Sequence, residues 1–144
     1  MSLQVPKLNA DAFIRLSRLE GPRRILLLRT AGLLTAASAA VALLPFRYAI
    51  RFGCVSLGEE RTSVADCLWA IEAASRRLPW RSVCIEKALV AQRLLRRRGL
   101  DAVLHYGARQ HEDTLEAHVW VTVDGESVIG GPESPSFAKV AEFP

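Results

Sequence analysis

Apolar residues recur at helical spacing along the first part of the chain. Asn9 can cap a short helix that runs to about Glu20. Pro22 suits the first turn of a second helix, which we expect to continue to Leu44. The pattern therefore predicts that residues 1–60 form a helical N-terminal part.

Two more helices are predicted after a connecting segment over residues 45–61, which contains a proline and two glycines. Ser63, followed three residues later by an acidic residue, resembles a capping box for a third helix that ends at Pro79. A fourth helix is expected from about Val83 to Arg98, because a glycine follows in the usual C-terminal position. The helical region thus reaches well beyond the middle of the chain.

The hydrophobic period changes after the fourth helix. Residues 102–106 form a short apolar strand, and residues 117–123 alternate between the two faces of a longer one. Asp124-Gly125 is a strong signal for a two-residue hairpin, with residues 127–129 as the return strand. The prolines that follow predict an end of regular structure. We therefore predict an α+β fold, in which a helical half packs on a small antiparallel sheet.

Length and composition agree with one folded domain. The chain has 144 residues, of which 50% are hydrophobic and 24% charged, as is typical of a globular protein. We expect a single domain over residues 1–144, with the helical part at 1–60 and a core at 61–144.

The net charge of +4 gathers in arginine runs, such as residues 96–98, that we interpret as solvated helix ends. Nucleic-acid binding would rest on this charge alone and is not expected. Three cysteines without a C-x-x-C pair favour reduced thiols in the cytoplasm over a disulfide framework or a zinc site. No cofactor and no metal is expected.

Residues 30–44 carry no charge and raise the question of a membrane. The segment has 15 residues, whereas a spanning helix needs about 20, and Pro45 ends it. We therefore interpret it as a buried helix. Peripheral attachment to a membrane through these residues is a disfavoured alternative, because an alanine-rich helix offers lipid little apolar area.

The candidate chemistry lies in Cys84 and His118. Cys84 falls in the first turn of the fourth helix, where unpaired N–H groups and the helix dipole favour a thiolate. His118 lies near the start of the longest predicted strand, from which its imidazole can act as a base if the strand lies beside the helix start. Backbone N–H at Cys84, with Trp80 or Ser82 nearby, would then form an oxyanion site.

Ordinary structural roles are the alternative for these residues. A cysteine is often a small buried hydrophobe, and a lone histidine on a strand is often structural. His105, in a short strand, and His111, in a polar loop, have weaker claims to a function. A zinc site from the three histidines and Cys84 would need ligands at unrelated spacings.

Several blocks of sequence together resemble the leader peptidase of lasso-peptide biosynthesis, the B protein, in its stand-alone B2 form. The resemblance covers about residues 60 to 140 and is carried by residues 78–85, 94–100, 106–107 and 117–121, in this order and spacing. It implies a fold similar to transglutaminases and papain-like proteases. It also implies that Cys84 is the nucleophile and His118 the base, in a triad completed by an aspartate.

The same resemblance implies the partners. The substrate would be a ribosomally made precursor peptide, cut between leader and core before a lasso cyclase (the C protein) closes the ring. The first 60 residues are too few for a leader-recognition module in addition to the peptidase's helices. A separate leader-recognition protein (B1) is therefore expected.

The third member of the triad departs from the family pattern. The family's aspartate would stand at Gly130, and Asp124, six residues from His118, lies too far along the strand for a hydrogen bond. A hairpin at Asp124-Gly125 pairs His118 with Gly131 and places Glu133 nearby, so Glu133 is the expected orienting residue. A backbone carbonyl, a water or a side chain from the helical half remains an alternative.

Two other functions stay open on this sequence. The same dyad could pass the acyl group to an amine, as transglutaminases do. Alternatively, the chain could be a catalytically silent scaffold that holds precursor and cyclase together, and the missing aspartate supports this reading.

Overall fold

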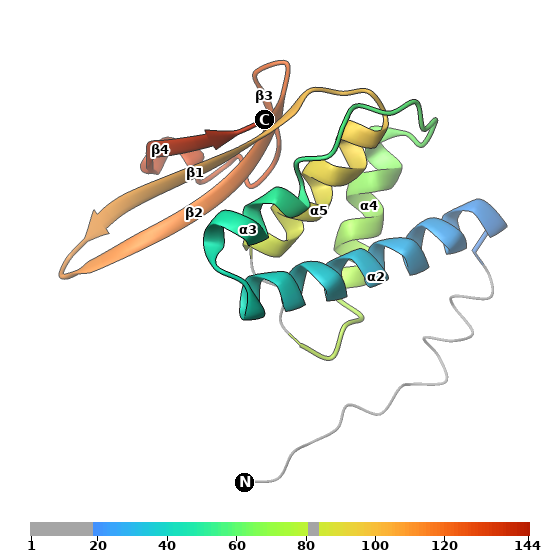
Figure 1. The fold of residues 1–144 in the computed structure, drawn as a ribbon, viewed down its shortest axis with the longest axis horizontal. Coiled ribbons are helices and arrows are strands. Elements are labelled where there is room, and N and C mark those ends of the chain that lie inside the picture. Colours follow the sequence, from blue (N-terminus) through green and yellow to red (C-terminus); the bar gives the residue numbers. More distant parts are fainter. Residues whose placement is uncertain (1–18, 81–83) are drawn as a thin grey trace, which may run out of the picture.

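The computed structural model describes residues 19–80 and 84–144. Helices pack on one side of a four-stranded antiparallel sheet, so the predicted α+β class is confirmed (Figure 1). The helix predicted from Asn9 lies largely outside the described residues.

Helix α2 (Gly21–Leu43) matches the predicted second helix and has Pro22 in its first turn. One face packs against the following helices and is buried at Leu26, Leu27, Thr30, Leu34 and Ala37. The opposite face leaves Ile25, Leu28 and Leu43 exposed. Among the described residues, α2 is the helix whose length and apolar composition would allow it to cross a membrane, a test that core helices of soluble proteins also pass.

The connection predicted over residues 45–61 contains helical turns that the sequence did not indicate. Helix α3 (Phe46–Ala49) and the 3-10 helix η1 (Ile50–Phe52) follow Pro45 directly. Pro45 therefore ends α2 and also leads into the next turn. Burial of Ala49 and Ile50 anchors these short helices on the core.

Helix α4 (Val64–Ser75) begins at the predicted cap, because the Ser63 hydroxyl oxygen accepts a hydrogen bond from the Asp66 N–H at 3.1 Å. It ends before the predicted Pro79. A proline disfavours helical geometry in the residue before it, and irregular turns occupy residues 76–80.

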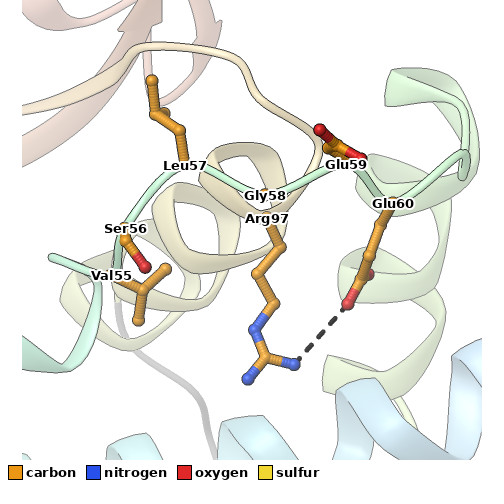
Figure 2. A pocket seen from close by; sticks show the side chains of 7 residues that line it. All are labelled: Val55, Ser56, Leu57, Gly58, Glu59, Glu60 and Arg97. Carbon is orange, nitrogen blue, oxygen red and sulfur yellow. Dashed lines mark ion pairs between the residues drawn. The ribbon is translucent and has the colours of Figure 1, made fainter.

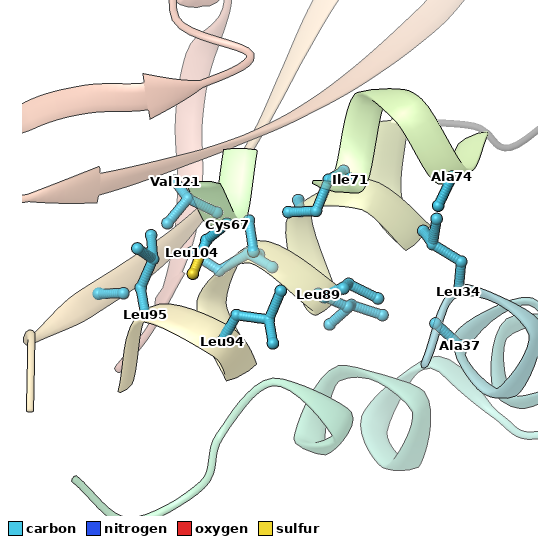
Figure 3. Packing of buried hydrophobic residues seen from close by; sticks show 14 of the residues in the cluster. Leu34, Ala37, Cys67, Ile71, Ala74, Leu89, Leu94, Leu95, Leu104 and Val121 are labelled. Carbon is cyan, nitrogen blue, oxygen red and sulfur yellow. The ribbon is translucent and has the colours of Figure 1, made fainter. Parts of the chain in front are cut away.

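Helix α5 (Cys84–Arg97) is the central element of the core and matches the predicted fourth helix. Its apolar residues contact α2 and α4 on one side and strands β1 and β2 on the other. Figure 3 shows this layer, in which Leu89 faces Leu34 of α2, and Leu95 lies near Val121 of the sheet. The N-terminal end of α5 is thereby fixed relative to the sheet.

The sheet has the strand order β3-β2-β1-β4. Its strands are β1 (Ala102–His111), β2 (Thr114–Val123), β3 (Glu126–Ile129) and β4 (Ala138–Phe143). The predicted hairpin at Asp124-Gly125 is confirmed, and both of its residues have positive φ angles.

The prediction that regular structure ends near Pro132 and Pro135 is wrong. The 3-10 helix η2 (Ser134–Ser136) and strand β4 follow, and β4 pairs with β1 at the far edge of the sheet. This pairing joins residues far apart in the chain. The Gln92 amide of α5 strengthens it by donating to the Phe143 carbonyl at 2.6 Å.

The predicted register between β2 and β3 is also corrected. Val123 pairs with Glu126 as expected, but the register then shifts, so that Val121 pairs with Ile129 instead of Val128. The extra residue is a β-bulge. The His118 side chain contacts the carbonyl of Gly130, one residue before the predicted partner Gly131.

Residues 55–60 run along the C-terminal end of α5 and, with Arg97, line a pocket of about 470 Å³ (Figure 2). The N–H of Gly58 donates to the Arg96 carbonyl, which satisfies a helix-end acceptor. Glu60 binds the Arg29 guanidinium through both carboxylate oxygens, at 2.8 and 3.1 Å, and lies 3.6 Å from Arg97. These pairs tie the segment to α2 and α5.

We expect the Glu60→Gln variant to lose part of the acid sensitivity of the fold. The Arg29 guanidinium lowers the pKa of the Glu60 carboxyl, so its stabilising contribution is complete above the ordinary pKa of about 4.3 and disappears as the pH falls through the lower folded pKa. Urea denaturation between about pH 6 and 3 measures this. The variant should be less stable at pH 6, with a smaller decline toward pH 3, and parallel curves would contradict the assignment.

Candidate active site

The fold places Cys84 at the first position of α5, with an exposed side chain. The N–H groups in the first turn of a helix have no partner within the helix, and they carry the positive end of its dipole. A developing oxyanion at this position would therefore be stabilised. Packing of α5 between the other helices and the sheet fixes this helix end.

His118 lies within β2, on the face opposite the core residues Val119 and Val121. Its side chain is 10% exposed. Strand β3 pairs with β2 only over Val121–Val123, so the edge of β2 beside His118 is left to the loop that follows β3. This loop supplies the polar partners of the imidazole.

The two residues meet at a pocket of about 620 Å³. Its lining comes from helices α4 and α5, from β2, and from the end of β3 with the loop that follows it: Glu72, Cys84, Lys87, Ala117, His118, Val119, Ile129, Gly130 and Glu133. All three of the predicted site residues are in this set. Within the described ranges no hydrogen bond joins Cys84 to His118, so the two residues border one pocket without a direct polar contact.

The closest polar contact of His118 is with a backbone atom. Its Nε2 lies 2.7 Å from the Gly130 carbonyl oxygen. A carbonyl can only accept a hydrogen bond, so Nε2 must carry the proton in this contact. In a neutral imidazole the Nδ1 atom is then bare and can accept a proton.

Glu133 approaches the other nitrogen. Its carboxylate lies 3.9 Å from His118 Nδ1, and its side chain is 75% exposed. The Gly130 carbonyl therefore occupies the orienting position at Nε2, and Glu133 is placed to face the imidazolium that forms when Nδ1 gains a proton. An orienting role for Glu133 stays a prediction.

The pocket also contains an ion pair that the sequence analysis missed. The Lys87 ammonium lies 3.4 Å from the Glu72 carboxylate, joining α5 to α4 beside Cys84. Lys87 stands three residues after Cys84, a spacing that puts both on one helix face. That spacing was the available signal, but Glu72 could be found only from the packing of the helices.

The remaining candidates lie elsewhere. His105 Nε2 is 2.8 Å from the Thr122 hydroxyl, and burial lowers the pKa of this imidazole. His111 ends β1 on the surface. The Trp80 indole N–H donates to the Ser38 hydroxyl at 3.1 Å, so it is engaged away from an oxyanion, and Ser82 lies outside the described residues. In the part of the chain that is described, no cluster of three or more His, Cys, Asp or Glu side chains could hold a metal ion.

A family model described as the transglutaminase-like superfamily matches residues 33–142, which is more than half of the chain. The match begins within α2 and ends within β4, so it includes both the helix that carries Cys84 and the strand that carries His118. No curated protein and no solved structure matches the chain. The extent of the family match shows that this chain belongs to the transglutaminase-like superfamily.

Proposed function

We propose that the chain is a cysteine peptidase that removes the leader from a lasso-peptide precursor, with Cys84 as nucleophile and His118 as base. The observation that carries the proposal is that Cys84, the first residue of α5, and His118 of β2 line one pocket, with the protonated Nε2 of His118 held by the Gly130 carbonyl. Membership of the superfamily supports thiol chemistry at this site.

In the proposed reaction, His118 Nδ1 takes the Cys84 thiol proton as the sulfur attacks the scissile carbonyl. A C–S bond forms and the carbonyl becomes an oxyanion at the start of α5. The C–N bond then breaks as the imidazolium returns its proton to the leaving amine. Water, deprotonated by Nδ1, attacks the thioester, releasing the leader's carboxylate and restoring the thiol.

The resemblance of residues 78–85 and 117–121 to lasso leader peptidases supports the substrate class. On this proposal, the protein acts in the cytoplasm on a precursor presented by a separate leader-recognition protein. The freed core then passes to the lasso cyclase. A pocket that is open to solvent and bordered by the loop after β3 agrees with an extended peptide as ligand.

The test is to mix the protein with the precursor and the recognition protein and to follow the products by mass. Hydrolysis yields leader and core as two fragments whose masses sum to that of the precursor plus one water. An adduct with an added amine would instead indicate transfer of the transglutaminase type. An intact precursor, together with a Cys84 thiol that iodoacetamide labels no faster than free cysteine, would favour the scaffold and contradict the peptidase.

A further inference from the structure

A group of stacked rings surrounds His118 on the face of the sheet that is turned away from the helices. The His118 imidazole is stacked on the Trp120 ring, with centroids 6.0 Å apart and planes 19° from parallel. Its ring centroid also lies 5.1 Å from that of the Phe137 ring. The Trp120 ring in turn is stacked on the His105 imidazole, with ring centroids 5.4 Å apart and planes 16° from parallel. The plane of the His118 ring is thus set by its neighbours.

The space for these rings exists because residue 107 is glycine. A Cβ atom at Gly107 would lie 2.8 Å from Trp120 Cζ3 and 3.0 Å from the Phe137 Cβ. Contacts below about 3 Å force one partner to move. Any larger residue at this position of β1 would therefore displace the rings that touch His118.

The outer members of the group are themselves held by polar contacts. The Arg109 guanidinium lies 4.5 Å from the Phe137 ring centre, and its Nε donates to Glu116 at 2.7 Å. His105 is held by the Thr122 hydroxyl and lies 3.3 Å from Glu142. The rings that contact His118 are therefore fixed by the sheet.

His118 needs this support because its hydrogen-bond partner is neutral. Hydrogen bonds to a charged group are roughly twice as strong as those between neutral groups. A backbone carbonyl at Nε2 therefore restrains the imidazole less than a carboxylate in the same place would. Ring packing can provide the missing restraint, since it limits rotation of the imidazole out of the plane in which Nε2 meets Gly130.

We propose that Trp120, seated over Gly107, is a positioning residue that keeps His118 Nε2 on the Gly130 carbonyl and Nδ1 on the side of Glu133, which lines the pocket. The expected effect on kcat rests on the proposed function. The expected effect on the His118 tautomer does not. The two consequences can be measured separately.

The experiment compares Trp120→Leu and Trp120→Phe with Trp69→Leu, a matched control. Trp69 is a partly buried tryptophan that packs on the core and contacts Arg23, away from His118. Two measurements are made on each variant: kcat and KM for leader release, and the tautomer of His118 from its imidazole ¹⁵N shifts. A merely structural role for Trp120 would move neither kcat nor the tautomer beyond the effect of the control.

We expect Trp120→Leu to lower kcat about a hundredfold while KM changes by less than about twofold, because the misplaced imidazole affects chemistry more than binding. Its His118 should become a mixture of both tautomers. Trp120→Phe keeps an aromatic face and should recover most of kcat. Equal kcat values and an unchanged His118 tautomer in Trp120→Leu and Trp69→Leu would overturn the proposal.

The positioning role of Trp120 can be tested even if the proposed peptidase function is wrong. If the wild-type protein cleaves no precursor, the ¹⁵N spectra alone decide the positioning role: a single Nε2–H tautomer that becomes mixed in Trp120→Leu supports it. A wild-type His118 already mixed between tautomers overturns it. Should Trp120→Leu not fold, Trp120→Phe and Gly107→Ala provide the same comparison, since a methyl group at Gly107 must shift the ring.

Discussion

Replacing Cys84 by serine is expected to reduce leader release at least about ten-thousandfold, the scale of losing an essential nucleophile. A serine hydroxyl fits the same space, but it gives up its proton far less readily than a thiol. Substrate contacts made by the rest of the pocket remain. The rate constant for a single turnover should therefore fall, while the affinity for precursor and recognition protein stays within about twofold.

The matched control is Cys54→Ser, the same exchange at a second exposed thiol. Cys54 lies on the segment after η1 and is not among the residues that line the pocket of His118. We expect the Cys54→Ser variant to cleave the precursor at the wild-type rate. Equal cleavage by the Cys84→Ser variant would remove Cys84 from the chemistry, whatever the pocket geometry.

Local signals were sufficient to predict the three long helices α2, α4 and α5. The Ser63 cap, Pro22 in a first turn and the glycine after α5 act over a few residues, so each is visible in the sequence alone. Strand β4 was missed because its position depends on pairing with residues of β1 that stand thirty or more positions earlier in the chain. Its exposed positions give a weak alternating pattern, as is common for edge strands.

The candidate site was predictable where chemistry resides in side chains. Cys84 and His118 could be identified from residue type and from the element that carries each. The contact of His118 with Gly130 could not, because the partner is a backbone carbonyl and no side chain marks it. The carbonyl also lies in the loop after β3, beyond the residues that pair with β2, so a strand register does not predict its position.

Placing at residue 130 the aspartate that the resemblance to lasso leader peptidases implies, by Gly130→Asp, should not improve leader cleavage. Gly130 has φ +71°, a conformation that costs other residues about 1 kcal/mol or more, and a Cβ there would lie 2.6 Å from the Val119 carbonyl oxygen. The loop after β3 must therefore move, and it takes the Gly130 carbonyl away from His118 Nε2. We expect loss of both stability and cleavage, measured by urea denaturation and by leader release.

Gly125→Asp separates the two causes of this loss. Gly125 has nearly the same backbone conformation, φ +80°, but nothing lies within 4 Å of a Cβ placed there. The Gly125→Asp variant should therefore lose only about 1 kcal/mol of unfolding free energy, the cost of the backbone conformation, and should cleave at the wild-type rate. Gly130→Asp should be less stable than this control by at least about 2 kcal/mol, because overlap with backbone cannot be relieved by a rotamer change. If Gly130→Asp instead cleaved faster than wild type, a carboxylate would orient His118 better than the carbonyl does. The contact between His118 and the Gly130 carbonyl would then not be required for cleavage.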